Sequence, residues 1–139
     1  MAVLYIDAFA GISGDMTVGA LLALGLPLQQ LQRELAQLHL AGYTVSSETR
    51  EVNGIAANKF RVHVSAQDPT HRAFRDIRAL LEHSSLQPEV KRHALAIFGK
   101  LAAAEARVHG VQPDDVEFHE VGAIDSIIDV VGTALGVVT

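Results

Sequence analysis

The segment EFHEVGAIDSIIDVVG, residues 117–132, places ionisable side chains among apolar ones. On a helix, Asp125 and Asp129 lie one turn apart on the flank of an apolar stripe. That stripe consists of Ile124, Ile127, Ile128 and Val131. Two carboxylates at this spacing repel one another, and a bound cation or a shared proton would relieve the repulsion. The alternative is that both are solvated, or that Asp125 serves the first turn of the helix, where a negative charge is favourable.

Imidazoles and a further carboxylate lie close by in the sequence. His109, His119 and Glu120 surround the loop GVQPDDVEF, just before the two aspartates. Together with Asp125 and Asp129 they form a nitrogen and oxygen donor set that suits a divalent ion. The spacing matches no short zinc motif such as HExxH, so this metal site is a hypothesis. Structural pairing of these groups with one another is the alternative.

A second group of candidate residues lies in the loop YIDAFAGISGDM. Gly11, Ser13, Gly14 and Asp15 stand where a helix is expected to begin, and such a junction can direct backbone N–H groups at a phosphate. The loop is neither GxGxxG nor a Walker A motif. Asp7 and Asp15 could instead hold Mg²⁺ or Mn²⁺ on a phosphorylated ligand. A tight turn with Asp15 in the first helical turn is the simpler alternative.

The elements that must position these groups are helices, one strand and one hairpin. The apolar run at residues 3–6 predicts a buried strand, and a helix is expected from residues 13–15 to Gly25. A second helix follows Pro27 and ends by Gly42. Alternating residues on either side of Asn53 and Gly54 predict a β-hairpin, because both residues tolerate a positive φ.

The second half of the chain is predicted to be helical. The expected helices cover approximately residues 72–82, 88–109 and 121 onward. Glu105 falls within the apolar stripe of the long helix, where a carboxylate would need a partner, and His109 is one turn further along. The remaining histidines have no close partner in the sequence, and the role of His71 is left open.

The predicted fold class is α+β. The polar, proline-containing segment SAQDPTH is the best internal boundary, so residues 1–66 would form an α/β subdomain with the glycine loop and hairpin. Residues 67–139 would form a helical subdomain that is truncated at its C-terminus, because the apolar final segment lacks a cap. Apolar side chains on that last helix would then be exposed, which predicts a homo-oligomer.

Composition excludes several classes of function. The chain has 139 residues, 49% of them hydrophobic, and a net charge of −5. No basic cluster indicates nucleic-acid binding, and no apolar run is long enough for a membrane span. The lack of cysteine excludes disulfides and thiol chemistry, limits any metal site to oxygen and imidazole ligands, and is consistent with a cytoplasmic protein.

Three stretches together resemble one protein family. They are DAFAGISGDMTVGALLALG, HRAFRDIRALLEHSSL and IFGKLAAAEARVHGVQPDDVEFHEVGAIDSIIDVVG, in this order along the chain. In these stretches the chain resembles the N-terminal part of the LarC family of nickel insertion proteins. The resemblance implies a CTP-dependent enzyme, a nickel cyclometallase of the lyase class. Such an enzyme inserts Ni²⁺ into pyridinium-3,5-bisthiocarboxylic acid mononucleotide to complete the nickel-pincer cofactor of lactate racemase.

The resemblance also implies a division of labour. The CTP site is expected in the missing C-terminal part of the same protein, so the isolated fragment would be inactive. His119, Glu120 and Asp125 are then the catalytic candidates, and Gly11, Ser13, Gly14 and Asp15 would bind the nucleotide. The metal candidates are Asp7, His109, His119, Asp125 and Asp129. A structural assembly module and a metal-dependent phosphate-ester hydrolase remain as alternatives.

Overall fold

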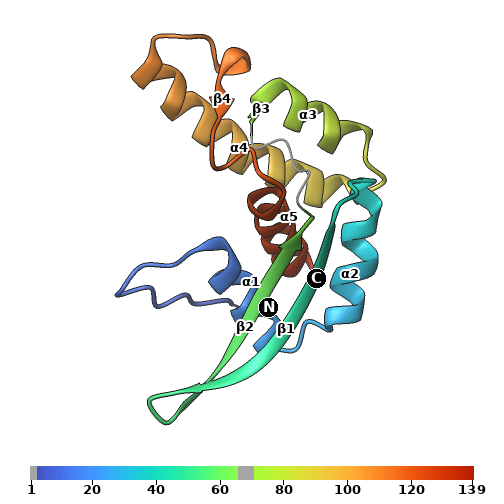
Figure 1. Ribbon diagram of the computed structural model, residues 1–139, viewed down its shortest axis with the longest axis vertical. Coiled ribbons are helices and arrows are strands. Elements are labelled where there is room, and N and C mark those ends of the chain that lie inside the picture. Colours follow the sequence, from blue (N-terminus) through green and yellow to red (C-terminus); the bar gives the residue numbers. More distant parts are fainter. Residues whose placement is uncertain (1–2, 66–70) are drawn as a thin grey trace.

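A computed structural model of the chain describes residues 3–65 and 71–139 (Figure 1). Helices and two small antiparallel sheets alternate along the chain, which confirms the predicted α+β class. The helical second half expected from the sequence is also present. Within the described residues, no helix is long and apolar enough to cross a membrane.

The segment before the first helix departs from the expected buried strand. Residues 3–13 form no strand, and Val3 and Tyr5 are 80% and 83% exposed. The prediction was wrong for this segment, because an apolar run is buried as a strand only where another strand lies beside it. Within the part of the chain that the structure describes, no strand pairs with it.

The first half otherwise follows the predicted order. Helix α1 (Gly14–Ala23) ends before Gly25, and α2 (Leu28–Leu35) begins directly after Pro27. The short 3₁₀-helix η1 (Ala36–Leu38) then leads into the hairpin of β1 (Tyr43–Val52) and β2 (Ile55–Val64). Asn53 and Gly54 have φ values of 53° and 79°, which is the double positive φ that a two-residue hairpin turn requires.

The second half contains the three expected helices. These are α3 (Phe74–His83), α4 (Pro88–His109) and α5 (Ile124–Val138). Between α4 and α5, the 3₁₀-helix η2 (Pro113–Asp115) precedes strand β4 (Glu117–Phe118), which pairs with β3 (Arg72–Ala73). The β3–β4 ladder was not predicted, because two residues are too few to show alternation. The proposed boundary falls largely on residues 66–70, outside the described residues, so the division at 66/67 stays a prediction.

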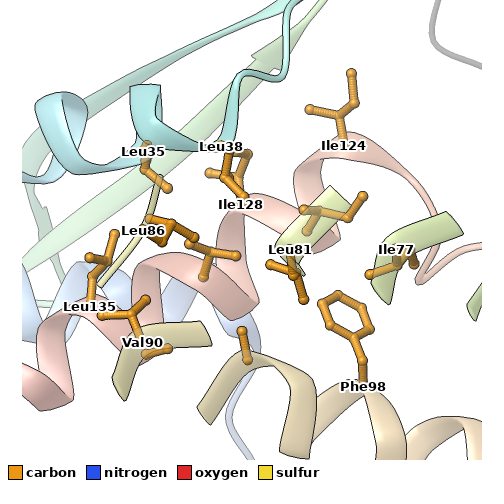
Figure 2. Packing of buried hydrophobic residues seen from close by; sticks show 14 of the residues in the cluster. Leu35, Leu38, Ile77, Leu81, Leu86, Val90, Phe98, Ile124, Ile128 and Leu135 are labelled. Atoms are coloured by element: carbon orange, nitrogen blue, oxygen red, sulfur yellow. The ribbon is translucent and has the colours of Figure 1, made fainter. Parts of the chain in front are cut away.

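Helix α5 forms the centre of the core (Figure 1). Its predicted apolar stripe is confirmed, since Ile127, Ile128 and Val131 are fully buried. Side chains of α2, α3 and α4 are directed toward it, and Figure 2 shows the packing of these apolar residues. The apolar cluster contains residues of both halves of the chain, and α5 also contacts α1 and β2.

The C-terminal end of α4 differs from the sequence interpretation. Its buried residues are Val90, Ala94, Phe98, Ala102 and Ala106, whereas Val108 is 79% exposed. Glu105 is therefore on the solvent side and not in the apolar stripe. Its carboxylate lies 3.3 Å from the His109 Nε2 atom, and both side chains are at least half exposed. This pair is a surface interaction of small energy.

Candidate functional site

Three aspartates meet where α1, α5 and the hairpin come together. Asp15 is in the first turn of α1, while Asp125 and Asp129 lie one turn apart on α5. They line a hollow of about 350 Å³ with residues 59–63 of β2, including Lys59 and His63. We call this hollow the aspartate cleft. It joins segments that are more than a hundred residues apart in the sequence.

Asp129 is the aspartate that the fold constrains most. Its Oδ1 atom is buried and has no hydrogen-bond partner within the described residues. Gly14 makes room for it, because a Cβ atom at Gly14 would lie 2.6 Å from the Asp129 Cβ atom. The glycine at the start of α1 is thus required by the close approach of the two helices.

The surroundings of Asp129 disfavour its charged form. Burial, followed by the negative charges of Asp15 and Asp125, raises the pKa of the Asp129 carboxyl from 3.8 to about 7. A backbone hydrogen bond from Asp15 acts in the opposite direction. Near neutral pH this carboxyl is therefore partly protonated, and a cation beside it would favour the charged form.

The other two aspartates are held by local hydrogen bonds. Ser13 Oγ donates to Asp15 Oδ1, and the backbone N–H of Met16 donates to the same oxygen at 2.9 Å. The backbone N–H of Ser126 donates to Asp125 Oδ1 at 2.8 Å. Both aspartates are thus oriented at helix N-termini, where the alternative interpretation from the sequence placed them.

A second constellation joins two imidazoles. His71 precedes β3, His119 follows β4, and their Nδ1 atoms are 3.1 Å apart. The ring centroids are 5.0 Å apart and the rings are nearly perpendicular. Both side chains are exposed. The sequence singled out His119 but not its partner, because the two histidines are 48 positions apart and no short motif links them.

The remaining candidate residues are distributed over other parts of the molecule. Asp7 and Gly11 line a mostly apolar hollow of about 300 Å³ together with Leu4, Tyr5 and Val137. His109 pairs with Glu105 at the end of α4. Glu120 is exposed, and its carbonyl oxygen accepts hydrogen bonds from the Ala123 N–H and the Ser126 hydroxyl.

The structure thus brings together some of the expected ligands and separates others. Ser13, Gly14 and Asp15 adjoin Asp125 and Asp129, whereas the described residues include no group of three acidic or histidine side chains arranged to hold a metal ion. The chemistry of the two places differs. Carboxylates suit a hard cation such as Mg²⁺ or Mn²⁺, whereas imidazoles suit Ni²⁺ and similar ions. Which residues bind a metal stays a prediction.

Comparison with known proteins identifies the family. The profile described as "Nickel insertion protein" matches residues 4–139. The chain belongs to the nickel insertion protein family. This match covers nearly the whole chain, including both candidate sites, and confirms the resemblance found in the sequence.

The relatives extend far beyond the region matched here. One from Geobacter sp. (strain M21) is 54% identical over 136 residues, which is 98% of this chain but 35% of the relative. Others from Syntrophobacter fumaroxidans and Wolinella succinogenes are 50% and 49% identical, over 98% of this chain and 34% and 35% of their own lengths. All three are named, provisionally, as nickel insertion proteins. The chain therefore spans about a third of these relatives, and no solved structure matches it.

Proposed function

We propose that this chain is the N-terminal part of a CTP-dependent nickel insertase, a cyclometallase that completes the nickel-pincer nucleotide cofactor of lactate racemase. In this reaction Ni²⁺ is a substrate, inserted into pyridinium-3,5-bisthiocarboxylic acid mononucleotide. The observation that carries the proposal is the family match over residues 4–139. The CTP site would lie in the part of the protein outside this region, and a cytoplasmic location belongs to the same proposal.

The aspartate cleft is the proposed place for a hard cation in this reaction. Mg²⁺ or Mn²⁺ prefers oxygen ligands and usually bridges protein carboxylates to phosphates. A cation between Asp15, Asp125 and Asp129 would neutralise the repulsion that raises the Asp129 pKa and would give its buried Oδ1 atom a partner. The phosphate of the pyridinium nucleotide could then bind to the same cation, which would orient the substrate for metal insertion.

The glycine loop and the imidazole supply the other proposed roles. Gly11 has a φ of 88°, and Ser13, Gly14 and Asp15 surround the start of α1, where backbone N–H groups attract a phosphate. His119, Glu120 and Asp125 would act on the nickel and on the carbon that loses its proton when the nickel–carbon bond forms. These roles follow from the residue types and remain predictions.

We further propose that the rest of the full-length protein covers the apolar N-terminal groove. This groove comprises the hollow beside residues 3–12 and the adjoining hollow that contains the chain end, with volumes of about 300 and 620 Å³. Val3 and Tyr5 line the groove and are 80% and 83% exposed, and Phe9 in the same segment is 95% exposed. Exposed apolar surface of this kind marks an interaction site. Because Thr139 lines the groove and most of each relative lies outside the matched region, the remaining polypeptide is the proposed occupant.

Hydrogen exchange can test this occupant. Amides of residues 3–12 should exchange quickly in the 139-residue chain and be protected in a full-length protein containing it. Equal exchange in both would contradict the proposal. A concentration-dependent dimer of the short chain that protects the same amides would assign the groove to a second copy, as in the homo-oligomer expected from the sequence.

Cofactor maturation in the full-length protein tests the enzymatic proposal. The triple variant of Asp15, Asp125 and Asp129 to Asn should abolish activation of lactate racemase, because the cleft loses its cation-binding charges. Glu51→Gln on the exposed hairpin is the matched control and should leave activation unchanged. Wild-type maturation by the triple variant would refute the role of the cleft. Failure of the wild-type protein to mature the racemase would refute the function itself.

A non-catalytic assembly module is the second candidate. The observation in its favour is that no group of three acidic or histidine side chains among the described residues is arranged to hold a metal ion. Calorimetry of the 139-residue chain with Ni²⁺, Mn²⁺ and Mg²⁺ separates the two candidates, since an assembly module would bind none of them stoichiometrically. Turnover of a generic phosphate ester by the isolated chain would instead favour the hydrolase.

A further inference from the structure

The two imidazoles at the β3–β4 ladder are cross-strand neighbours. In the ladder, Arg72 pairs with Phe118 and Ala73 pairs with Glu117. Continuing this antiparallel register by one residue places His71 opposite His119. Directly opposed residues of an antiparallel pair have Cβ atoms about 4.5–5.5 Å apart, so their side chains must interact. The contact of the two rings thus follows from the backbone pairing and not from a chance meeting of surface side chains.

The distance between the two nitrogens fits a shared metal ion. The Nδ1 atoms are 3.1 Å apart. Metal–imidazole bonds of about 2.0–2.1 Å would separate two nitrogens by about 2.9 Å at a right angle and about 3.4 Å at the tetrahedral angle. The observed separation lies between these values. Both lone pairs could therefore be directed at one ion after rotation of the two rings.

The segment that carries His119 is firmly anchored. Phe118, its neighbour, is buried against the rings of Phe74 and Phe98. Gly122 closes the turn after His119, and a Cβ atom there would lie 2.7 Å from the Phe118 carbonyl oxygen. The backbone is thus fixed on both sides of His119. Both imidazole side chains remain exposed to solvent, as an accessible metal ligand requires.

Charge near the pair also favours a cation. Glu117 and Glu120 flank His119 in the sequence, and both are exposed. The nearest positive residue in sequence, Arg72, donates from Nη1 to the Gly122 carbonyl oxygen at 2.7 Å. Adjacent strand residues point to opposite faces, so the Arg72 side chain leaves the ladder on the side away from His71.

We propose that His71 and His119 form a nickel-capture site with two imidazole ligands and open coordination positions. Without metal, one Nδ1–H donates to the other Nδ1 atom. On binding, that proton moves through solvent to Nε2 of its own ring, so both neutral rings present Nδ1 lone pairs and no net proton is released. Imidazole ligands suit Ni²⁺, and the open positions allow a transient cargo to be passed on. The assignment of nickel as occupant rests on the proposed function.

Nickel binding to the 139-residue chain tests this site directly. Calorimetry with NiCl₂ should show one site in the wild type, and His71→Ala or His119→Ala should each weaken it by at least about tenfold, since each removes a direct ligand. His83→Ala is the matched control, because His83 is exposed and its Nδ1 atom lies 2.7 Å from the Ala79 carbonyl oxygen of its own helix. Far-UV circular dichroism should be unchanged in all three variants, since the replaced side chains are on the surface.

Proton NMR provides a second readout that does not depend on affinity. Paramagnetic Ni²⁺ should shift or broaden the ring signals of His71 and His119 at ratios that leave the His83 signal unchanged. Equal nickel affinity in the wild type and the His71/His119 double variant would overturn the inference, and so would a wild type that binds no nickel. These measurements need no cofactor maturation. They can therefore refute the nickel site while the insertase function stands, and the maturation assay can refute the insertase function while the nickel site stands.

Discussion

Replacing Asp129 by Asn should stabilise the protein at neutral pH and have no effect at low pH. The Asp129 carboxyl has its pKa raised to about 7 by burial and by Asp15 and Asp125. Asparagine has nearly the same shape, and its side-chain oxygen can accept the backbone hydrogen bond from Asp15. Its amide group would also donate toward the neighbouring carboxylates instead of repelling them. The substitution therefore removes an unfavourable charge without leaving a cavity.

The pH dependence follows from the direction of the shift. The folded pKa of about 7 exceeds the ordinary value of 3.8, so between these pH values the folded state holds a proton that the unfolded state has lost. The free energy of unfolding of the wild type must then fall as the pH rises from about 4 to about 7. The asparagine side chain of the Asp129→Asn variant cannot titrate, so the variant lacks this part of the decline.

The size of the effect is limited by solvent. A shift from 3.8 to about 7 would correspond to about 4 kcal/mol if the group were fully removed from water. Asp129 is only partly buried, and screening of such partly exposed charges reduces the expected gain to about 1–2 kcal/mol. In a domain of this size, that gain should raise the melting temperature by about 3–8 °C at pH 8.

Urea denaturation of both proteins between pH 4 and pH 8 provides the measurement. The two unfolding curves should coincide near pH 4 and separate progressively toward pH 8, with the variant more stable. Addition of Mg²⁺ should narrow the gap if the aspartate cleft binds it, because the cation stabilises only the charged form. A difference that is independent of pH, or a less stable variant at pH 8, would refute the electrostatic account of this site.

Three further substitutions, with Gly99→Ala as a control, test the packing and the turn conformation on which the fold depends. Gly14→Ala should cost about 1–3 kcal/mol of unfolding free energy, because the added Cβ atom would lie 2.6 Å from the Asp129 Cβ atom. Gly99→Ala in α4 is the control, since the nearest atom that a Cβ added at Gly99 would meet is 4.0 Å away, on Phe74. It should be neutral or slightly stabilising in the same urea titration. Phe98→Ala should lower the free energy of unfolding by about 3–5 kcal/mol, since Phe98 is fully buried. Calorimetry should show a clear fall in melting temperature, and a nearly unchanged melting temperature would contradict this prediction. Gly54→Ala should lower the melting temperature by an amount equivalent to about 1 kcal/mol, because a φ of 79° strains an alanine. An unchanged melting temperature would mean that the turn can rearrange.

Periodic patterns in the sequence determined most of the local structure. The apolar repeat of α5 predicted its buried face, and Ile127, Ile128 and Val131 are indeed fully buried. Asn53 and Gly54 predicted the hairpin, because only residues that tolerate a positive φ fit such a turn. Pro27 and Gly25 likewise marked the helix ends. These features depend on neighbouring residues, so the sequence contains the information needed to predict them.

Contacts between distant segments were decided only by the tertiary structure. The strand expected at residues 3–6 does not form, because a strand needs a partner that the local pattern cannot specify. Glu105 proved to be on the surface because the buried face of α4 consists of residues four positions apart, through Ala102 and Ala106, and Glu105 lies outside that face. His71 meets His119 through a ladder of only two residue pairs, too short to show as a pattern. Residue types thus indicated which chemistry the chain could perform, whereas the packing of α1, α5 and the two small sheets determined which of those residues meet.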